Sequence, residues 1–251
     1  MKKLKNFLTS SKVTLGAFIL AVALLGFSSI GGARAALAYY SENYVSRVQM
    51  QNIGVTLLEN GSAVSSRDYG DTADGNWTET SGALLENMIP EGEEFKLGKT
   101  YPEELAVQNS GSISEYVRVS IYKYWKDENG AKMPNLSPDL IDLHLTGNGW
   151  LEDTEAKTAE RTVLYYSSVL GAGQTSSLFA DTLTVDGAVA TKVKQVPSED
   201  GKTITAVYEY DGVEFCVEAK VDAVQEHNGQ DAIWSAWGRR VTVSGGSLSL
   251  N

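Results

Sequence analysis

The sequence predicts an all-β protein, built as a single antiparallel jelly-roll or β-sandwich domain over residues 51–251. Apolar and polar side chains alternate with a period of two in about eight to ten segments, which is typical of strands with one buried face. Gly-rich and Asn-rich connections separate these segments. Helical periodicity is scarce, and we expect only short helices at residues 230–237, with Asn228 as a cap, and at residues 153–160.

The clearest strands flank the turn-rich residues 109–112. Leu105 and Val107 alternate with polar residues before this turn, and residues 117–121 alternate after it. Each segment therefore has one face suited to a core. Residues 62–82 are instead small, polar and rich in Gly, Asp and Ser, and we predict a long surface loop there.

The longest alternation covers residues 213–223, where Val, Phe and Ala face one side and Glu, Cys and Lys face the other. We expect residues 203–210 to pair with it across a two-residue turn at Asp211-Gly212, a dipeptide typical of tight hairpins. Further strand candidates are residues 45–58, 162–169, 182–185, 188–193 and 241–250.

Residues 1–38 have the pattern of a secretory signal peptide. Four lysines open the chain, residues 13–30 are almost wholly apolar, and Ala36 and Ala38 precede Tyr39. This order of basic, apolar and small residues predicts cleavage by a signal peptidase, after Ala35 or after Ala38. The alternative is a membrane anchor, because about 18 apolar residues can just span a bilayer. We expect cleavage, and therefore a secreted protein of the extracellular matrix or cell surface without a stable membrane anchor.

Charge and cysteine content restrict the class of protein further. Residues 1–38 hold five of the 21 basic residues and none of the 32 acidic ones, which leaves a net charge of −16 for the remainder. Such a charge disfavours nucleic acids and anionic membrane surfaces as partners. Cys216 is the single cysteine, so no disulfide can form within the chain, which favours a bacterial exported protein.

The residue types that carry catalysis do not form a recognisable pattern. His144 and His227 are the two histidines, and no His-Glu-x-x-His motif is present. Asp68, Asp71 and Asp74 recur every third residue, but a calcium loop needs ligands at alternate positions. Cys216 has no histidine partner in the sequence pattern. We therefore expect no enzyme activity, no metal site and no cofactor.

Aromatic residues provide a second hypothesis of function. Trp125 and Trp150 are candidates for an exposed surface that stacks on sugar rings. A monomeric extracellular binding module or adhesin would use such a surface to recognise a glycan or a host protein. Most aromatic side chains are nevertheless buried, because they contribute large apolar areas, and we expect these two to fill or cap the core.

Several segments together resemble one family. Residues 36–42, Ala-Leu-Ala-Tyr-Tyr-Ser-Glu, resemble the export junction of proteins processed by the SipW-type signal peptidase of Gram-positive bacteria. Residues 95–122 resemble the strand-turn-strand of the TasA/camelysin-like family, although Leu97 and Lys99 replace its Pro and Asp. Residues 165–179 and 221–237 are also similar to that family, and the resemblance extends over most of the chain.

The resemblance implies a secreted jelly-roll protein that assembles into fibres of the biofilm matrix. In such fibres the N-terminal segment of one subunit adds a strand to the next. Here that segment is residues 39–50, with Tyr40, Val45, Val48 and Met50 as the side chains that would fill pockets. The alternative is that this segment pairs within its own sheet. The partners implied are further copies of the chain, an accessory subunit, and the signal peptidase during export.

The family resemblance also raises a metalloprotease hypothesis, because some camelysin-like members are described as such enzymes. This sequence contains no zinc-binding motif that such an enzyme would need. We therefore expect a non-enzymatic structural protein.

Overall fold

The computed structural model describes Leu15 and residues 18–20, 52–68, 78–86, 88–197 and 204–251. Residues 50–251 form one compact unit. In this described part of the chain, no helix combines the length and the apolar character needed to cross a bilayer.

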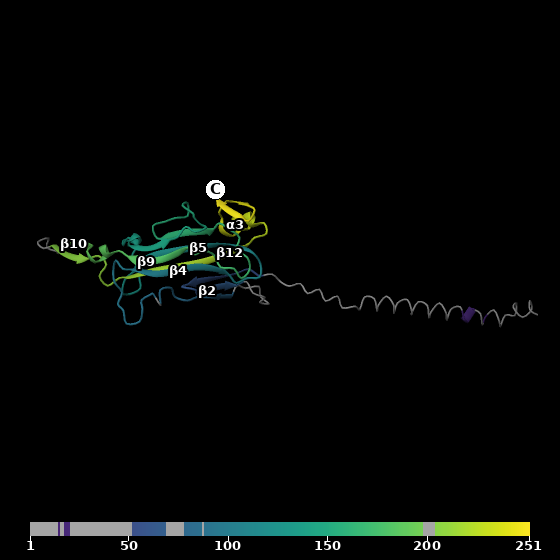
Figure 1. Cartoon of the computed structure of the whole chain (residues 1–251), viewed down its shortest axis with the longest axis horizontal. Coiled ribbons are helices and arrows are strands. Elements are labelled where there is room, and N and C mark those ends of the chain that lie inside the picture. The colour runs from purple at the N-terminus through teal and green to yellow at the C-terminus, as the bar shows by residue number, and fades with distance from the viewer. Residues whose placement is uncertain (1–14, 16–17, 21–51, 69–77, 87, 198–203) are drawn as a thin grey trace, which may run out of the picture. The chain divides into compact units, whose positions relative to one another are not determined.

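Two antiparallel sheets make up the fold (Figure 1). The six-stranded sheet has the order β3-β2-β1-β4-β9-β6, and the four-stranded sheet has the order β12-β5-β8-β7. The strands of the first are β1 (Gly54–Glu59), β2 (Ser62–Asp68), β3 (Thr78–Thr80), β4 (Thr100–Asn109), β6 (Ile141–Leu145) and β9 (Ala180–Val185). Those of the second are β5 (Glu115–Lys126), β7 (Trp150–Glu152), β8 (Arg161–Tyr166) and β12 (Glu214–Gln225). The predicted all-β antiparallel sandwich is confirmed.

Smaller elements complete the chain. Two hairpins pair β10 (Val193–Pro197) with β11 (Ile204–Tyr208), and β13 (Val241–Ser244) with β14 (Ser247–Leu250). Among the described residues from 52 onward, the helical elements are η1 (Pro138–Leu140), η2 (Gly187–Ala190) and α3 (Gly229–Trp237).

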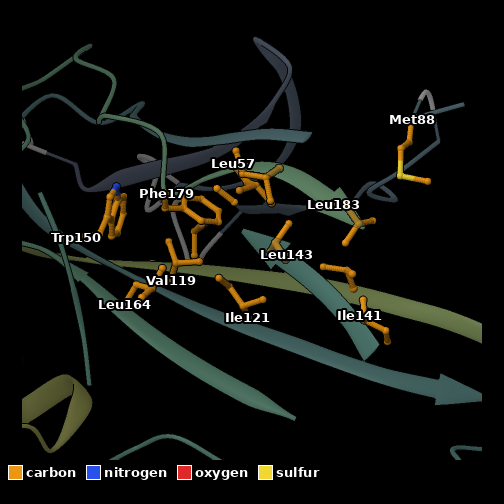
Figure 2. Close-up of a cluster of buried hydrophobic side chains, with 14 of the residues drawn as sticks. Leu57, Met88, Val119, Ile121, Ile141, Leu143, Trp150, Leu164, Phe179 and Leu183 are labelled. Carbon is orange, nitrogen blue, oxygen red and sulfur yellow. The ribbon is translucent and has the colours of Figure 1, made fainter. Parts of the chain in front are cut away.

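The main core lies between the two sheets (Figure 2). Leu57 of β1 and Leu183 of β9 come from one sheet, and Val119 and Ile121 of β5 come from the other; each is at most 2% exposed. Phe179 is fully buried and stands edge-on to Trp150, with the ring centroids 5.5 Å apart. Removal of these apolar side chains from water is the main driving force for the packing of the two sheets.

A second core covers the outer face of the four-stranded sheet. Tyr116, Tyr165 and Val224 project from that face and pack against Ile233 of α3 and Leu248 of β14. The helix was predicted at this place, and its apolar side is the reason it lies there. Asn228 precedes the helix as expected, but its carbonyl oxygen, not its side chain, accepts the first hydrogen bonds.

Two strand predictions were wrong because tertiary pairing outweighed local signals. Asp211-Gly212 does not close a hairpin: β11 pairs with β10, while β12 forms a ladder with β5 along its whole length. Residues 62–82 are not one loop, because β2 pairs with β1 through the turn Asn60-Gly61. Both turn residues have positive φ, 49° and 81°, as a two-residue hairpin turn requires.

Three further segments differ from expectation. Residues 187–190 are the 3-10 helix η2, and residues 153–160 form turns in place of a helix. Residues 241–250 form two strands because Gly245-Gly246 provides a turn with positive φ at both positions. Of the predicted strand 45–58, β1 begins at Gly54, and residues 45–51 lie outside the described residues.

Candidate functional site

The free edge of β12 is the candidate functional site. Within the described part of the chain, β12 has β5 as its one ladder partner, although it is twelve residues long. The Glu226 N–H donates to the Ser114 carbonyl in register with this ladder. Because ladder hydrogen bonds alternate along antiparallel strands, the N–H and C=O groups of residues 215, 217, 219 and 221 point away from β5. An unpaired edge of this kind is a template for another strand.

A hollow of about 490 Å³ runs beside this edge. Its β12 lining alternates between the inner sheet face, with Phe215, Val217 and Ala219, and the outer face, with Cys216, Glu218 and Lys220. The hollow therefore lies beside the strand and not over one face of it. We call it the β12 groove.

The opposite wall of the β12 groove belongs to the six-stranded sheet. Residues 82–85 pass so close to β2 that a Cβ atom on Gly82 would stand 2.4 Å from the Val64 carbonyl oxygen. Leu84 and Leu85 then project into the groove, and both also line a second hollow of about 630 Å³ near Leu97. The two hollows share these leucines and Phe215, so the groove continues as an apolar surface.

A hydrogen bond to a buried carboxyl group holds this wall. The Leu85 N–H donates to Glu59 Oε1 at 2.6 Å, and Leu85 has a positive φ of 72°. Glu59 is 8% exposed and lies beside Glu103, which is fully buried. Burial, and next the neighbouring Glu59, raise the pKa of Glu103. The Glu103 carboxyl group therefore favours its protonated form at neutral pH.

The outer rim of the β12 groove is polar and unreactive. The Tyr124 hydroxyl bonds to Glu218, and the ammonium groups of Lys126 and Lys132 lie 5.3 and 4.7 Å from the Tyr124 ring. Burial raises the pKa of the Cys216 thiol. A protonated thiol is a poor nucleophile, which agrees with a structural role for Cys216.

An ion-pair network closes the groove near the end of β12. Asp222 accepts from Arg67 of β2 and from Arg118 of β5, each at 2.8 Å. The first pair joins the six-stranded sheet to the four-stranded sheet. The sequence pattern did not reveal this network, because Asp222 occupies an outward position among other charged residues.

Replacement of Asp222 by asparagine is expected to lower the free energy of unfolding by about 2 kcal/mol, because two partly buried guanidinium groups lose their carboxylate. Urea denaturation monitored by fluorescence measures this change. Glu79, the exposed second partner of Arg67, provides the control: Glu79→Gln should cost less than about 0.5 kcal/mol. Equal effects of the two substitutions would contradict a bridging role for Asp222.

The point where the N-terminal segment enters the domain is tightly packed. The Gly54 carbonyl accepts from the N–H groups of Ser110 and Gly111, and the Gly54 N–H donates to the buried Glu115 at 3.4 Å. A Cβ atom on Gly54 would lie 2.4 Å from Asp68, so no larger residue fits. Glu115 pairs with Gln225, the last residue of β12. Gly54 therefore lies at the Gln225 end of β12, and the groove lies toward the other end.

The hypothesis of a sugar-binding surface at Trp125 and Trp150 was wrong. Their side chains are 2% and 5% exposed. The Trp125 indole N–H donates to the Ser137 carbonyl at 2.9 Å, and that of Trp150 donates to the Ser177 carbonyl at 3.0 Å. Because the rings fill the core and their polar atoms are satisfied, neither can stack on a ligand. Both tryptophans fill the core, as their large apolar area led us to expect.

The remaining candidate residues have separate positions. His144 is exposed and pairs with Asp181 at 2.7 Å. Among the described residues, no three His, Cys, Asp or Glu side chains are grouped so that they could hold a metal ion. The cleavage and donor-strand candidates lie outside the described residues: Ala36, Ala38, Tyr39, Tyr40, Val45, Val48 and Met50. Comparison of the chain with protein-family models, curated proteins and solved structures found no match.

Proposed function

We propose that this chain is a secreted, non-enzymatic structural protein of a bacterial surface or biofilm matrix. It assembles into fibres when residues 39–50 of one copy enter the β12 groove of the next. The observation that carries the proposal is the unpaired edge of β12 with a hollow along it. The resemblance of the export junction and of three later segments to the TasA/camelysin-like family supports the same assembly.

The dimensions of the groove and of the donor segment agree. The lining of the two hollows includes β12 and its approach over residues 213–220, which in extended conformation span about 27 Å. Residues 39–50 are twelve residues, which in extended conformation reach about 40 Å, so this segment can fill the length of the groove. Main-chain hydrogen bonds to the outward N–H and C=O groups of β12 would then provide affinity.

The side chains of the donor segment match the β12 groove, which lies beside β12 between the inner and outer faces of the four-stranded sheet. In an extended strand Tyr40, Val48 and Met50 share one face, and Val45 belongs to the opposite face. The inner side of the β12 groove is apolar at Leu57, and its outer side carries Lys220. We assign the face with Tyr40, Val48 and Met50 to the inner side, because burial of these side chains is favourable.

The direction of the chain favours an open polymer. Gly54, at the start of β1, lies near Gln225, and the groove is lined by the opposite half of β12. A donor and an acceptor on different surfaces form a head-to-tail contact, which continues as a filament unless the rotation closes a ring. An accessory subunit that offers only one of the two surfaces would start or end such a filament.

The decisive experiment compares two purified forms at equal concentration, one that starts at Tyr39 and one that starts at Gln51. We expect the longer form to produce filaments in electron microscopy and concentration-dependent light scattering, and the shorter form to remain monomeric. Circular dichroism checks that both are folded. A longer form that stays monomeric at all concentrations indicates pairing within its own sheet and refutes strand donation between copies.

A further inference from the structure

A small polar pocket beside Trp234 carries an inference that is independent of fibre assembly. We propose that Trp234 and its neighbours bind a single hexose ring of a glycan, at a site distinct from the β12 groove. Gln230, Asp231 and Trp234 of α3 line this pocket together with Arg240, Val241 and Asn251.

Trp234 is exposed where the other described tryptophans are covered. Its exposed fraction is 49%, against 2% for Trp125 and 5% for Trp150, and Trp237 packs edge-on to Tyr165 at 5.6 Å. An indole buries up to about 250 Å², so leaving half of it in water forgoes considerable stabilisation. The position is rigid, because the adjacent Ile233 is fully buried in the second core.

Polar groups of complementary kinds surround the indole. Gln230 and Asp231 precede Trp234 by four and three residues, so the three side chains share one face of α3. The Arg240 guanidinium lies over the Trp234 ring, 4.7 Å from its centroid, and so covers one face of the indole. Among the described residues, neither Asp231 nor Arg240 forms an ion pair. Their hydrogen-bonding capacity is therefore available to a ligand.

Asn251 adds an oriented amide. Asn251 Oδ1 accepts from the Thr242 hydroxyl at 2.8 Å, and its backbone oxygen accepts from Arg239 at 3.0 Å. This arrangement leaves the Asn251 amide N–H groups as donors. The pocket thus combines the Asp231 carboxylate as an acceptor with the Arg240 guanidinium and the Asn251 amide as donors. The Gln230 amide can both donate and accept hydrogen bonds.

A pyranose ring fits this combination best. Its hydroxyl groups both donate and accept, and its C–H face is apolar enough to lie on the indole face that Arg240 does not cover. The pocket volume is about 190 Å³, below the range of about 300–1,000 Å³ for sites that enclose drug-sized ligands. We therefore assign one ring of a neutral or N-acetylated hexose to the pocket, with the rest of the glycan in solvent.

Titration calorimetry of the purified chain with methyl glycosides of glucose, galactose and N-acetylglucosamine, and with their oligosaccharides, tests the site. We expect saturable binding of at least one of them, weakened at least tenfold in Trp234→Ala and in Asp231→Asn, and largely retained in Trp234→Phe. Tyr208→Ala, which removes an aromatic residue that is 59% exposed on β11, is the matched control and should bind normally. Thermal unfolding checks the fold of each variant.

Three results would overturn the assignment. The first is the absence of saturable binding by any of these sugars. The second is binding that Trp234→Ala leaves unchanged, or that Tyr208→Ala weakens equally. The third is that methyl glucuronide, added as an anionic probe, is the one sugar that binds, and that its binding depends on Arg240 but not on Trp234, which would indicate simple charge recognition. Since Trp234 lies away from the β12 groove, the filament assay distinguishes failure of this site from failure of fibre assembly.

Discussion

Replacement of Ala219 by proline is expected to abolish filament formation and leave the subunit folded. The Ala219 N–H points to the free edge of β12, as the ladder register requires. Proline removes this donor without breaking a hydrogen bond to β5, and proline is tolerated on edge strands for that reason. An incoming strand would lose a central hydrogen bond and meet the pyrrolidine ring, so filament mass should fall by at least tenfold at equal concentration.

The control for this experiment is Ala223→Pro on the same free edge. Ala223 lies beyond Asp222, whose pairs with Arg67 and Arg118 close the groove. We therefore expect Ala223→Pro to leave filament formation nearly unchanged. Sedimentation and electron microscopy of the form that starts at Tyr39 provide the measurement. Filaments of normal length from Ala219→Pro would show that the donor segment does not pair with β12.

Stability is expected to decrease as pH rises, and Glu115→Gln should remove a large part of that dependence. Burial is the main cause that raises the pKa of Glu115 from 4.5 to about 8, and the charge of Asp68 adds to it. Because the folded protein holds this proton more tightly than the unfolded chain, the contribution of neutral Glu115 is complete below pH 4.5. It is lost progressively up to about pH 8, by an amount on the order of 4 kcal/mol.

Urea denaturation at pH 4.5, 6.5 and 8.5 measures this dependence. Glutamine keeps an oxygen that can accept from the Gly54 N–H, so Glu115→Gln should resemble the native chain at pH 4.5 and exceed it by about 2–4 kcal/mol at pH 8.5. Glu104→Gln, on the exposed side of β4, is the control and should not change the slope. An identical slope in Glu115→Gln would mean that Glu115 is already charged in the folded protein at neutral pH.

The strands that the sequence predicted best are those with long, regular alternation. β5 and β12 were found because one face of each must be apolar to cover the core. β2 was missed because its residues are mostly small and polar; the Asn60-Gly61 turn was the signal that could have located it. The hairpin at Asp211-Gly212 was predicted from local turn chemistry alone. It does not form, because β12 pairs instead with β5 over twelve residue pairs.

For the candidate sites, too, local sequence patterns decided some features and tertiary contacts decided the others. For Trp125 and Trp150 the sequence favoured burial, because aromatic side chains contribute large apolar areas, but it offered an exposed binding surface as the alternative. The structure buries both and leaves Trp234 in solvent, because Ile233 and Trp237 occupy the side of α3 that faces the sheet. The free edge of β12 was also beyond prediction, because strand order in a sheet depends on partners far apart in the chain.

Periodicity and composition by themselves determined the all-β class, the position of α3 and the high negative charge, because alternation, helical spacing and charge are properties of neighbouring residues. They also provide the expectation of export. Only the tertiary structure decided which strand is left unpaired, which tryptophan is exposed and which carboxyl groups are buried. These features depend on contacts between residues such as Arg67 and Asp222, whose side chains meet across 155 positions of sequence, and such contacts have no local signal.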